Sequence, residues 1–326
     1  MSDATPPQNS EDSQRPGGPA EASDRRGLGF LTLAAAALVV LLAAGSLLWP
    51  RSSHQDAAHA LLVFDSSGDL GRVAAVYEPL CAYLTETSGA ALELSVVRTV
   101  SAFEAQLGTR PDFVFAPDGL ALTAPVAQYL PLVVGRRSAP QNLRPRGVLV
   151  YRIAAGEVVA PWLSHAERTV LGDSLSLVAN GALRSETGAD QRRQCAAGPD
   201  PYDHGPVLHA LRLGGFDFAV VRQWDAERFF NEGLLDDSVF AVRNLVGPAP
   251  DAVLLVSRQV PRHQRLRCGE GLSGLGRQSS DAEAPVARDL RTGLADLHLA
   301  GFNVLVEPDF ELVRRNFAGD WLSGAD

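Results

Sequence analysis

The feature that most constrains this chain is an uncharged apolar run over residues 28–49. The run is long enough to cross a bilayer as one helix. Arg25 and Arg26 precede it, and Trp49 and Arg51 stand at its far end. Because basic residues stay on the cytoplasmic side, the sequence predicts a cytoplasmic N-terminus and an exported remainder.

The predicted organisation has a disordered cytoplasmic tail over 1–27, a transmembrane anchor over 28–49, a linker over 50–60 and a domain over 61–326. A cleaved signal peptide is the alternative, since Ala58, His59 and Ala60 have the small-x-small form of a cleavage site. The apolar run is longer than a usual signal core, which favours the anchor. The expected location is therefore the inner (cytoplasmic) membrane, single-pass, with the domain outside the cytoplasm, or secretion after cleavage.

All 29 basic residues are arginine, because the chain contains no lysine. This absence excludes a Walker A loop, a Schiff-base lysine and a Ser-x-x-Lys nucleophile pair. The formal net charge of −9 argues against a nucleic-acid partner. No pair of histidines has the spacing of a zinc site. The sequence therefore predicts no cofactor, no metal and no nucleic acid.

After the linker, short apolar runs alternate with amphipathic stretches, which is typical of an α/β domain. Ten strands are expected, over 61–66, 91–99, 112–118, 130–136, 147–153, 167–173, 216–224, 238–244, 252–258 and 302–308. Helices are expected over 73–89, 100–109, 175–188, 206–215, 225–235, 284–301 and 309–317. We expect a first lobe at about 61–150 and a second at about 151–250, with the remainder returning to pack on both.

A weak internal repeat joins the two halves. Residues 103–118 and 208–225 each read as a helix, a Gly turn, an Asp-Phe strand and then an acidic residue. Because open parallel sheets bind ligands at the carboxyl ends of their strands, Asp118 and Asp225 are expected to face a cleft between the lobes. The alternative is that both acids only cap helices.

The three cysteines cannot all pair within one chain. Cys81 falls in a helical pattern and is expected to be a buried small hydrophobe. Cys195 and Cys268 fall in polar, Arg-rich segments that read as loops, so they form the possible disulfide in an oxidising compartment. Residues 269–274 match G-x-G-x-x-G by letter but follow no strand, so they read as a surface loop.

Residues 61–118, with the helix motif Tyr-x-Pro-Leu-x-x-Tyr-Leu at 77–84, resemble the start of periplasmic phosphate, phosphite and phosphonate substrate-binding proteins. The likeness continues over 130–136, 147–153, 170–183 and 202–225. The resemblance implies an α/β, two-lobed type II periplasmic-binding-protein fold with a ligand cleft between the lobes. It also implies a small-molecule solute and an ABC permease as partner.

The family shows Asp-Pro-x-Ser-Thr-Ser-Gly where this chain has residues 173–179. Only Ser176 keeps a hydroxyl of the Ser-Thr-Ser trio, although Ser174 lies nearby. A helix start there still offers backbone N–H groups to an anion, or either serine only caps the helix. The resemblance also places an anion-contacting turn at Tyr202 and His204, where the alternative is again a cap.

These observations predict a membrane-anchored, extracytoplasmic solute-binding protein, not an enzyme, for a small anion or zwitterion of the phosphonate type. Ser174, Ser176, Tyr202 and His204 are expected to face the anion. Asp118 and Asp225 are expected to meet a cationic end, so that plain phosphate binds poorly. The alternatives are a sensory or scaffold module without a transporter and an enzyme on the same fold. An enzyme would need Asp118, Asp203, His204 or Asp225 as its general base.

Overall fold

The computed structural model describes residues 59–125, 127–137, 146–153, 167–176, 195–246, 251–275 and 284–305. The predicted tail, the predicted anchor and most of the predicted linker lie outside these residues. So do most of the helix expected over 175–188 and the whole of the helix expected over 309–317. Within the described residues, no helix has the length and apolarity needed to span a membrane.

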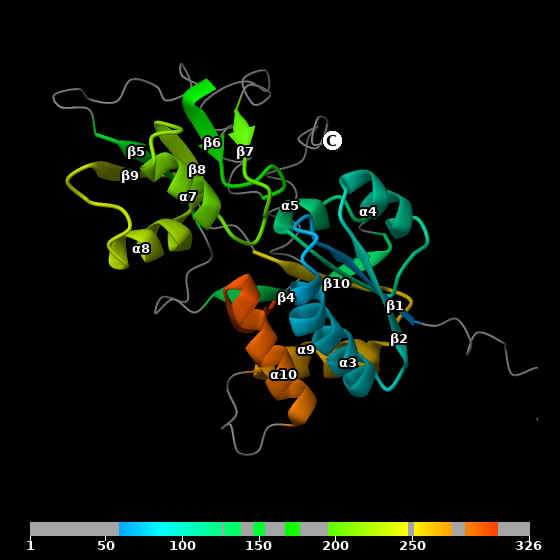
Figure 1. Cartoon of the computed structure of the whole chain (residues 1–326). Coiled ribbons are helices and arrows are strands. Elements are labelled where there is room, and N and C mark those ends of the chain that lie inside the picture. Colours follow the sequence, from blue (N-terminus) through cyan, green and yellow to red (C-terminus); the bar gives the residue numbers. More distant parts are fainter. Residues whose placement is uncertain are drawn as a thin grey trace, which may run out of the picture. The chain divides into compact units, whose positions relative to one another are not determined.

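The first sheet has six strands in the order β11-β4-β10-β3-β1-β2 (Figure 1). Its members are β1 (His59–Phe64), β2 (Leu92–Val97), β3 (Phe113–Ala116), β4 (Tyr129–Arg137), β10 (Val253–Ser257) and β11 (Leu299–Val304). β1 runs parallel to β2 and β3, whereas β10 is antiparallel to both β3 and β4. The last four residues of β1 are all buried, as expected for a strand covered on both faces.

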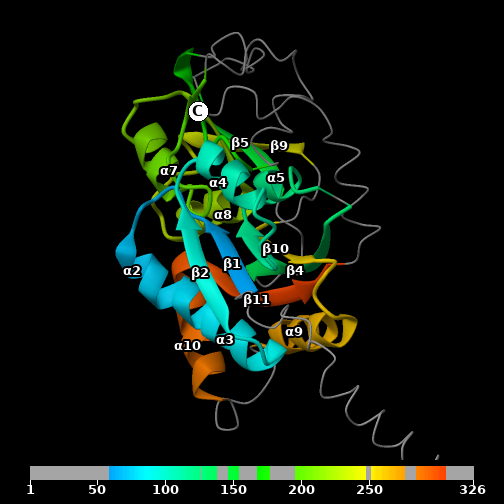
Figure 2. The same ribbon diagram turned by 90° about the vertical axis from the view of Figure 1, so that its right-hand side faces the viewer.

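Helices from both ends of the sequence cover this sheet. They are α2 (Leu70–Arg72), a π-helical turn η2 (Val73–Tyr77), α3 (Glu78–Ser88), α4 (Val100–Leu107), α5 (Asp118–Ala121), α9 (Arg262–Gly274), α10 (Pro285–Leu294) and a 3₁₀ turn η6 (Ala295–Leu297). α3 packs against both α9 and α10, and the three helices lie side by side in the view of Figure 1. Figure 2 shows α2 and α3 beside β2. α3 ends at Gly89, whose φ of 75° suits glycine.

The second sheet has five strands in the order β7-β6-β8-β5-β9. They are β5 (Gly147–Arg152), β6 (Thr169–Leu171), β7 (Ala196–Ala197), β8 (Phe218–Arg222) and β9 (Phe240–Val246). α7 (Gly205–Arg212) and α8 (Gln223–Asn231) pack against β8. Both sheets are therefore mixed, with parallel and antiparallel neighbours in each.

The chain passes between the sheets twice, after β4 and after β9. We define the first lobe as residues 59–137 with 251–305 and the second lobe as residues 146–246. β5 pairs with β8 and β9, so the run 147–153 belongs to the second lobe and does not link the two. The predicted boundary at residue 150 falls inside this strand. A strand pattern carries no information about which sheet will accept the strand.

The internal repeat corresponds to equivalent units in the two lobes. In the first, α4 leads to β3 and Asp118 lies in the first turn of α5. In the second, α7 leads to β8 and Asp225 lies in the first turn of α8. The predicted helix, strand and acidic residue therefore recur in the same order.

The segment around residues 262–274 corrects two predictions. It forms the helix α9, not a loop, and its buried Cys268, Gly269 and Leu272 face the first lobe's interior. Within this helix, the backbone at Gly271 passes close to Tyr83. An added Cβ at this position would lie 2.7 Å from the hydroxyl oxygen of Tyr83, which explains why the helix has a glycine there. The letter match to G-x-G-x-x-G thus reflects helix packing and not a nucleotide loop.

None of the three cysteines forms a disulfide among the described residues. Cys81 is buried in the first lobe's core, as expected. Cys268 belongs to that same core, whereas Cys195 packs against the second sheet. The structure therefore contains no Cys195–Cys268 disulfide, and burial raises the pKa of both thiols to about 11.

Two side chains of the second lobe lie within the hydrophobic core of the first. Tyr202 is 1% exposed and stacks on Phe115, with ring centroids 6.1 Å apart. Its hydroxyl donates to the carbonyl oxygen of Phe64 at 3.0 Å. Leu175 packs in the cluster that contains Phe64. These contacts fix the second lobe's loops to the end of β1.

Candidate functional site

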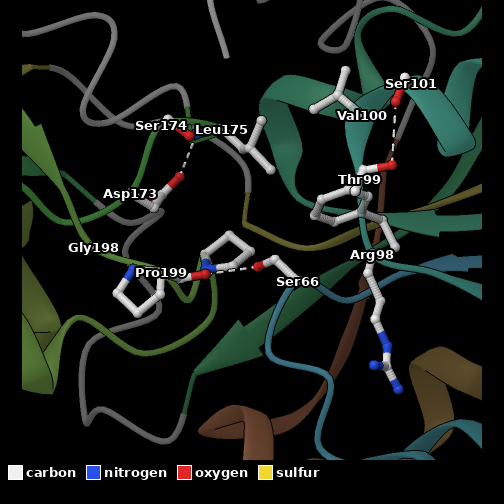
Figure 3. Close-up of a pocket in the computed structure, with 12 residues that line it drawn as sticks. Ser66, Arg98, Thr99, Val100, Ser101, Asp173, Ser174, Leu175, Gly198 and Pro199 are labelled. Carbon is white, nitrogen blue, oxygen red and sulfur yellow. Dashed lines mark hydrogen bonds between the residues drawn. The ribbon is translucent and has the colours of Figure 1, made fainter. Parts of the chain in front are cut away.

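A cavity of about 400 Å³ lies among loops at the carboxyl ends of strands from both sheets (Figure 3). Its first-lobe lining follows β1 and β2, and its second-lobe lining follows β6 and β7. The lining residues are Phe64, Ser66, Arg98, Thr99, Val100, Ser101, Asp173, Ser174, Leu175, Gly198, Pro199 and Pro201. Its volume suits a small molecule, and its position matches the usual ligand site of open α/β sheets.

The first-lobe wall is built around the start of α4. Thr99 caps this helix, because its hydroxyl oxygen accepts from the backbone N–H of Ala102 at 3.2 Å. The hydroxyls of Thr99 and Ser101 lie 3.3 Å apart and stand together on the wall of the cavity (Figure 3). This wall offers hydroxyl groups beside the positive end of a helix.

Arg98 stands at the rim of the same wall and is exposed. Its guanidinium passes the backbone of Gly68, where an added Cβ would lie 3.2 Å from Nη1. No carboxylate among the described residues forms an ion pair with it. Figure 3 shows the side chain extending along the rim and away from Ser174. Arg98 therefore supplies a positive charge to the cavity lining that no carboxylate of the described residues pairs with.

The second-lobe wall is a tight turn that starts at Asp173. One carboxylate oxygen of this residue accepts from the backbone N–H groups of Leu175 at 2.6 Å and Ser176 at 2.5 Å. Ser174 is half-buried and faces the cavity, whereas Ser176 is fully buried. Asp173 therefore makes helix-cap-like contacts in this turn.

His204 lies beneath the turn and is fully buried. Its Nε2 is 2.8 Å from the second carboxylate oxygen of Asp173, and its Nδ1 accepts from the backbone N–H of Arg222 at 3.1 Å. Burial raises the pKa of Asp173, but the hydrogen bond from His204 and the charge of Arg222 outweigh it and hold this pKa below its usual range. Asp173 is thus an ionised, fully hydrogen-bonded carboxylate.

Two glycines allow this close packing. An added Cβ at Gly172 would lie 2.3 Å from Nδ1 of His204. At Gly198 it would lie 2.2 Å from the carbonyl oxygen of Gly172. Since neither distance is attainable, the two backbones can approach each other and the imidazole only without side chains at these positions.

Asp118 and Asp225 are buried and do not line the cavity. Asp118 accepts from the backbone N–H of Gly119 at 2.8 Å. Asp225 lies 3.6 Å from Nη2 of Arg228 and 3.7 Å from Nδ1 of His204. Both side chains are therefore buried and outside the lining of this cavity, whereas the sequence had placed them facing a cleft.

Arg222 is a buried cation, and the charges of several buried acids act on it. Burial lowers its pKa, but Asp251, Asp173, Asp225 and Asp118 outweigh this effect and hold the pKa above its usual range. Asp251 also pairs with Arg137 at 2.5 Å, at the end of β4. The acidic residues of the repeat therefore belong to an ionic network near the two crossovers between the sheets.

The cavity contains one of the six predicted ligand-contacting residues, Ser174. Ser176, His204 and Tyr202 lie behind its walls, with Tyr202 anchored in the first lobe. Sequence reasoning missed Arg98, Thr99 and Ser101. A signal was present, because Arg98 and Thr99 end the expected strand and Ser101 falls in the first turn of the expected helix.

Comparison with known proteins shows the fold. No family model matches the chain, and no curated protein sequence does. Among solved structures, XAC2383 from Xanthomonas citri bound to ATP has a TM-score of 0.56 and 16% identity, over 79% of this chain and 96% of that one. PhnD1 from Prochlorococcus marinus in complex with methylphosphonate has a TM-score of 0.54 and 10% identity, over 79% and 97%.

A third structure is a binding protein component of an ABC phosphonate transporter from Pseudomonas aeruginosa. It has a TM-score of 0.51 and 11% identity, over 82% of this chain and 93% of that one. The described part of the chain therefore shares a two-sheet α/β fold with these solved structures. Its cavity lies where such a fold places a small ligand.

Proposed function

We propose that this protein is an extracytoplasmic solute-binding protein for a small oxyanion with an apolar substituent. The observation that carries the proposal is the composition of the cavity walls. Hydroxyls of Thr99, Ser101 and Ser174 stand on its two sides, and Arg98, which pairs with no carboxylate of the described residues, is also part of its lining. Phe64 supplies apolar surface, and two prolines and two aliphatic residues add to it. Such a lining suits a phosphonate or a related organic anion.

The placement of the acids changes the expected ligand. Asp118 and Asp225 were expected to receive a cationic end, but both are buried outside the cavity. A zwitterion would therefore find no free carboxylate there. We propose that methylphosphonate binds at least as well as aminomethylphosphonate.

Replacing Arg98 by glutamine is expected to weaken methylphosphonate binding by about 10-fold. The reason is the loss of a cation whose charge attracts the anion to the cavity, worth roughly 1.4 kcal/mol. Isothermal titration calorimetry on the purified exported domain measures this. Arg288→Gln is the matched control, because Arg288 is exposed on α10 and does not line the cavity.

The calorimetric series also judges the ligand class. If methylphosphonate, phosphate and ATP at millimolar concentrations all give no heat of binding with the unaltered domain, the anion proposal is wrong. Unchanged affinity in the Arg98 variant would instead show that Arg98 does not contribute to binding. Binding would then depend on the hydroxyl groups of the two cavity walls.

Binding without catalysis is favoured by the same geometry. The four residues considered as a general base are Asp118, Asp203, His204 and Asp225, and none of them lines the cavity. Two of the similar structures are described as a transporter's binding component and as a methylphosphonate complex. We propose delivery to an ABC permease as the role. Co-purification of a permease would support this, and co-purification of a sensor kinase would favour the sensory alternative.

The membrane anchor over 28–49 is part of this proposal. A reporter that is active only outside the cytoplasm, fused to the C-terminus, is expected to be active, and the mature protein is expected to keep its N-terminal tail. Arg25 and Arg26 should hold that tail in the cytoplasm. N-terminal sequencing is the measurement, and a mature chain that begins at Leu61 would replace the anchor by a cleaved signal peptide.

A further inference from the structure

The two lobes meet beside the cavity through the loops that follow β1 and β7. The hydroxyl of Ser66, in the first lobe, donates to the carbonyl oxygen of Pro199, in the second lobe, at 2.7 Å (Figure 3). Both residues line the cavity, and so does Pro201 further along the second loop. At this point the lining passes from one lobe to the other, so its shape depends on the distance between the two loops.

Arg72 joins the same two regions by its charge. Its Nη2 lies 2.7 Å from a carboxylate oxygen of Asp200 in the second lobe, and its Nη1 lies 3.4 Å from a carboxylate oxygen of Asp65 in the first. The side chain of Arg72 is 11% exposed, and those of Asp200 and Asp65 are 13% and 2% exposed. One largely buried guanidinium is therefore the shared counter-ion of two carboxylates that belong to different lobes.

Each of these acids is also held within its own lobe. The second oxygen of Asp65 accepts from the hydroxyl of the buried Tyr77 at 2.9 Å. The second oxygen of Asp200 accepts from the backbone N–H of Tyr202 at 2.9 Å. Burial lowers the pKa of Arg72, but the hydrogen bond and the charge of Asp200 outweigh this effect and hold the pKa above its usual range. A charged guanidinium therefore lies between two fixed carboxylates.

We infer that Arg72 is a positioning residue of the proposed anion site, whose ion pair with Asp200 holds the two cavity-lining loops together before any solute binds. The inference rests on the proposed function, because it concerns the same cavity. Arg72 itself does not line that cavity, so it acts on binding through the spacing of the loops. The contacts that set this spacing are the chain's own and do not require the solute.

Loss of the guanidinium would remove the cation that Asp65 and Asp200 share. Each carboxylate would keep its donor within its own lobe, so the repulsion between the two negative charges would act on the distance between the lobes. A solute binds only to the fraction of molecules whose loops are correctly spaced, and the apparent affinity falls in proportion to that fraction. A competent fraction of about one tenth corresponds to binding that is about 10-fold weaker.

Calorimetry with methylphosphonate tests the ion pair. Arg72→Gln is expected to weaken binding about 10-fold. Asp200→Asn is expected to weaken it several-fold, because the amide can keep the bond to the N–H of Tyr202 but not the ion pair. The double variant is expected to bind no more weakly than Arg72→Gln alone, since both changes break one interaction. Arg168→Gln is the control, because its ion pair with Asp217 lies within the second lobe and outside the cavity lining.

The sign of the Asp200→Asn effect separates positioning from direct attraction. If Arg72 only attracted the anion from a distance, removal of a nearby carboxylate would strengthen binding. Stronger binding by Asp200→Asn, or unchanged binding by Arg72→Gln, would overturn the inference while the proposed function stands. A lower calorimetric stoichiometry at unchanged affinity would show that Arg72 serves only folding, and this result would also overturn it.

A measured distance between the lobes tests the inference without an affinity. Spin labels are attached through Leu213→Cys at the end of α7 and Arg288→Cys on α10, which are exposed positions in different lobes. Single-cysteine substitutions correct for labelling of the native cysteines. Pulsed electron paramagnetic resonance is expected to give one distance with and without methylphosphonate, and a longer distance in Arg72→Gln without it.

Two results of the distance measurement would overturn the inference. One is a distance that shortens when methylphosphonate binds to the protein with Arg72 intact, because the solute would then bring the lobes together. The other is an unchanged distance in Arg72→Gln. If the distances are as expected but methylphosphonate, phosphate and ATP all give no heat of binding, the proposed function fails and the role of Arg72 between the lobes stands.

Discussion

Replacing Tyr202 by alanine is expected to lower the free energy of unfolding by about 3 to 5 kcal/mol. The phenol ring is 1% exposed and packs on Phe115 inside the first lobe, although Tyr202 belongs to the second. Truncation would leave a void between the lobes and would remove the hydroxyl that bonds to Phe64. Urea unfolding followed by tryptophan fluorescence measures the change.

Tyr202→Phe is the matched control for this prediction. It keeps the stacked ring and removes only the hydrogen bond to the Phe64 carbonyl, for an expected loss of about 1 to 2 kcal/mol. In Tyr202→Ala we also expect the two lobes to unfold in separate steps, because the anchor between them is lost. A single transition with an unchanged midpoint would show that the lobes are coupled elsewhere.

Replacing Gly293 by alanine is expected to cost about 3 kcal/mol of stability, at the upper end of what overpacking usually costs. A Cβ at this position of α10 would lie 1.6 Å from the carbonyl oxygen of Ala75 and 2.6 Å from its carbonyl carbon. These are backbone atoms of η2, which cannot turn aside as a flexible side chain can. α10 would have to move away from η2, and thermal unfolding measures the result.

Gly274→Ala is the control for that helix substitution. No atom lies within 4 Å of the position of its Cβ, and Gly274 is the last residue of α9. Alanine there is expected to be neutral or to stabilise by a few tenths of a kcal/mol, since it restricts the unfolded chain. Equal destabilisation by the two substitutions would mean that the approach of α10 to η2 is not tight in solution.

The sequence predicted the elements of this fold well and their assembly less well. Ten apolar runs were expected as strands and each overlaps one, because burial on a sheet leaves a local pattern. The two-residue β7 left no such pattern. The assignment of β5 to the second sheet and the helical state of residues 262–274 depend on long-range packing. α9 is rich in arginine, so its three buried residues did not stand out as an apolar periodicity in the sequence.

For the site too, local features could be predicted from the sequence, whereas long-range contacts could not. Ser174 could be placed at the cavity because a turn after a strand end is a local feature. Asp118 and Asp225 also follow strands, yet both are buried, and their charges act on the buried Arg222. Arg98 was overlooked because one exposed arginine among 29 basic residues carries no distinguishing pattern. The role proposed for Arg98 follows only from the structure, in which it lines the cavity that residues of both lobes enclose.

The pairing of β4 has a consequence for biosynthesis. Its two neighbours in the sheet, β10 and β11, both follow the entire second lobe in sequence. As the chain emerges N-terminus first, β2, β1 and β3 can pair early, whereas β4 has no partner until more than one hundred later residues have been made. A nascent chain halted before β10 would expose β4 along both edges, and exposed edges invite aggregation. The first lobe therefore cannot complete its sheet until its last strands have been made.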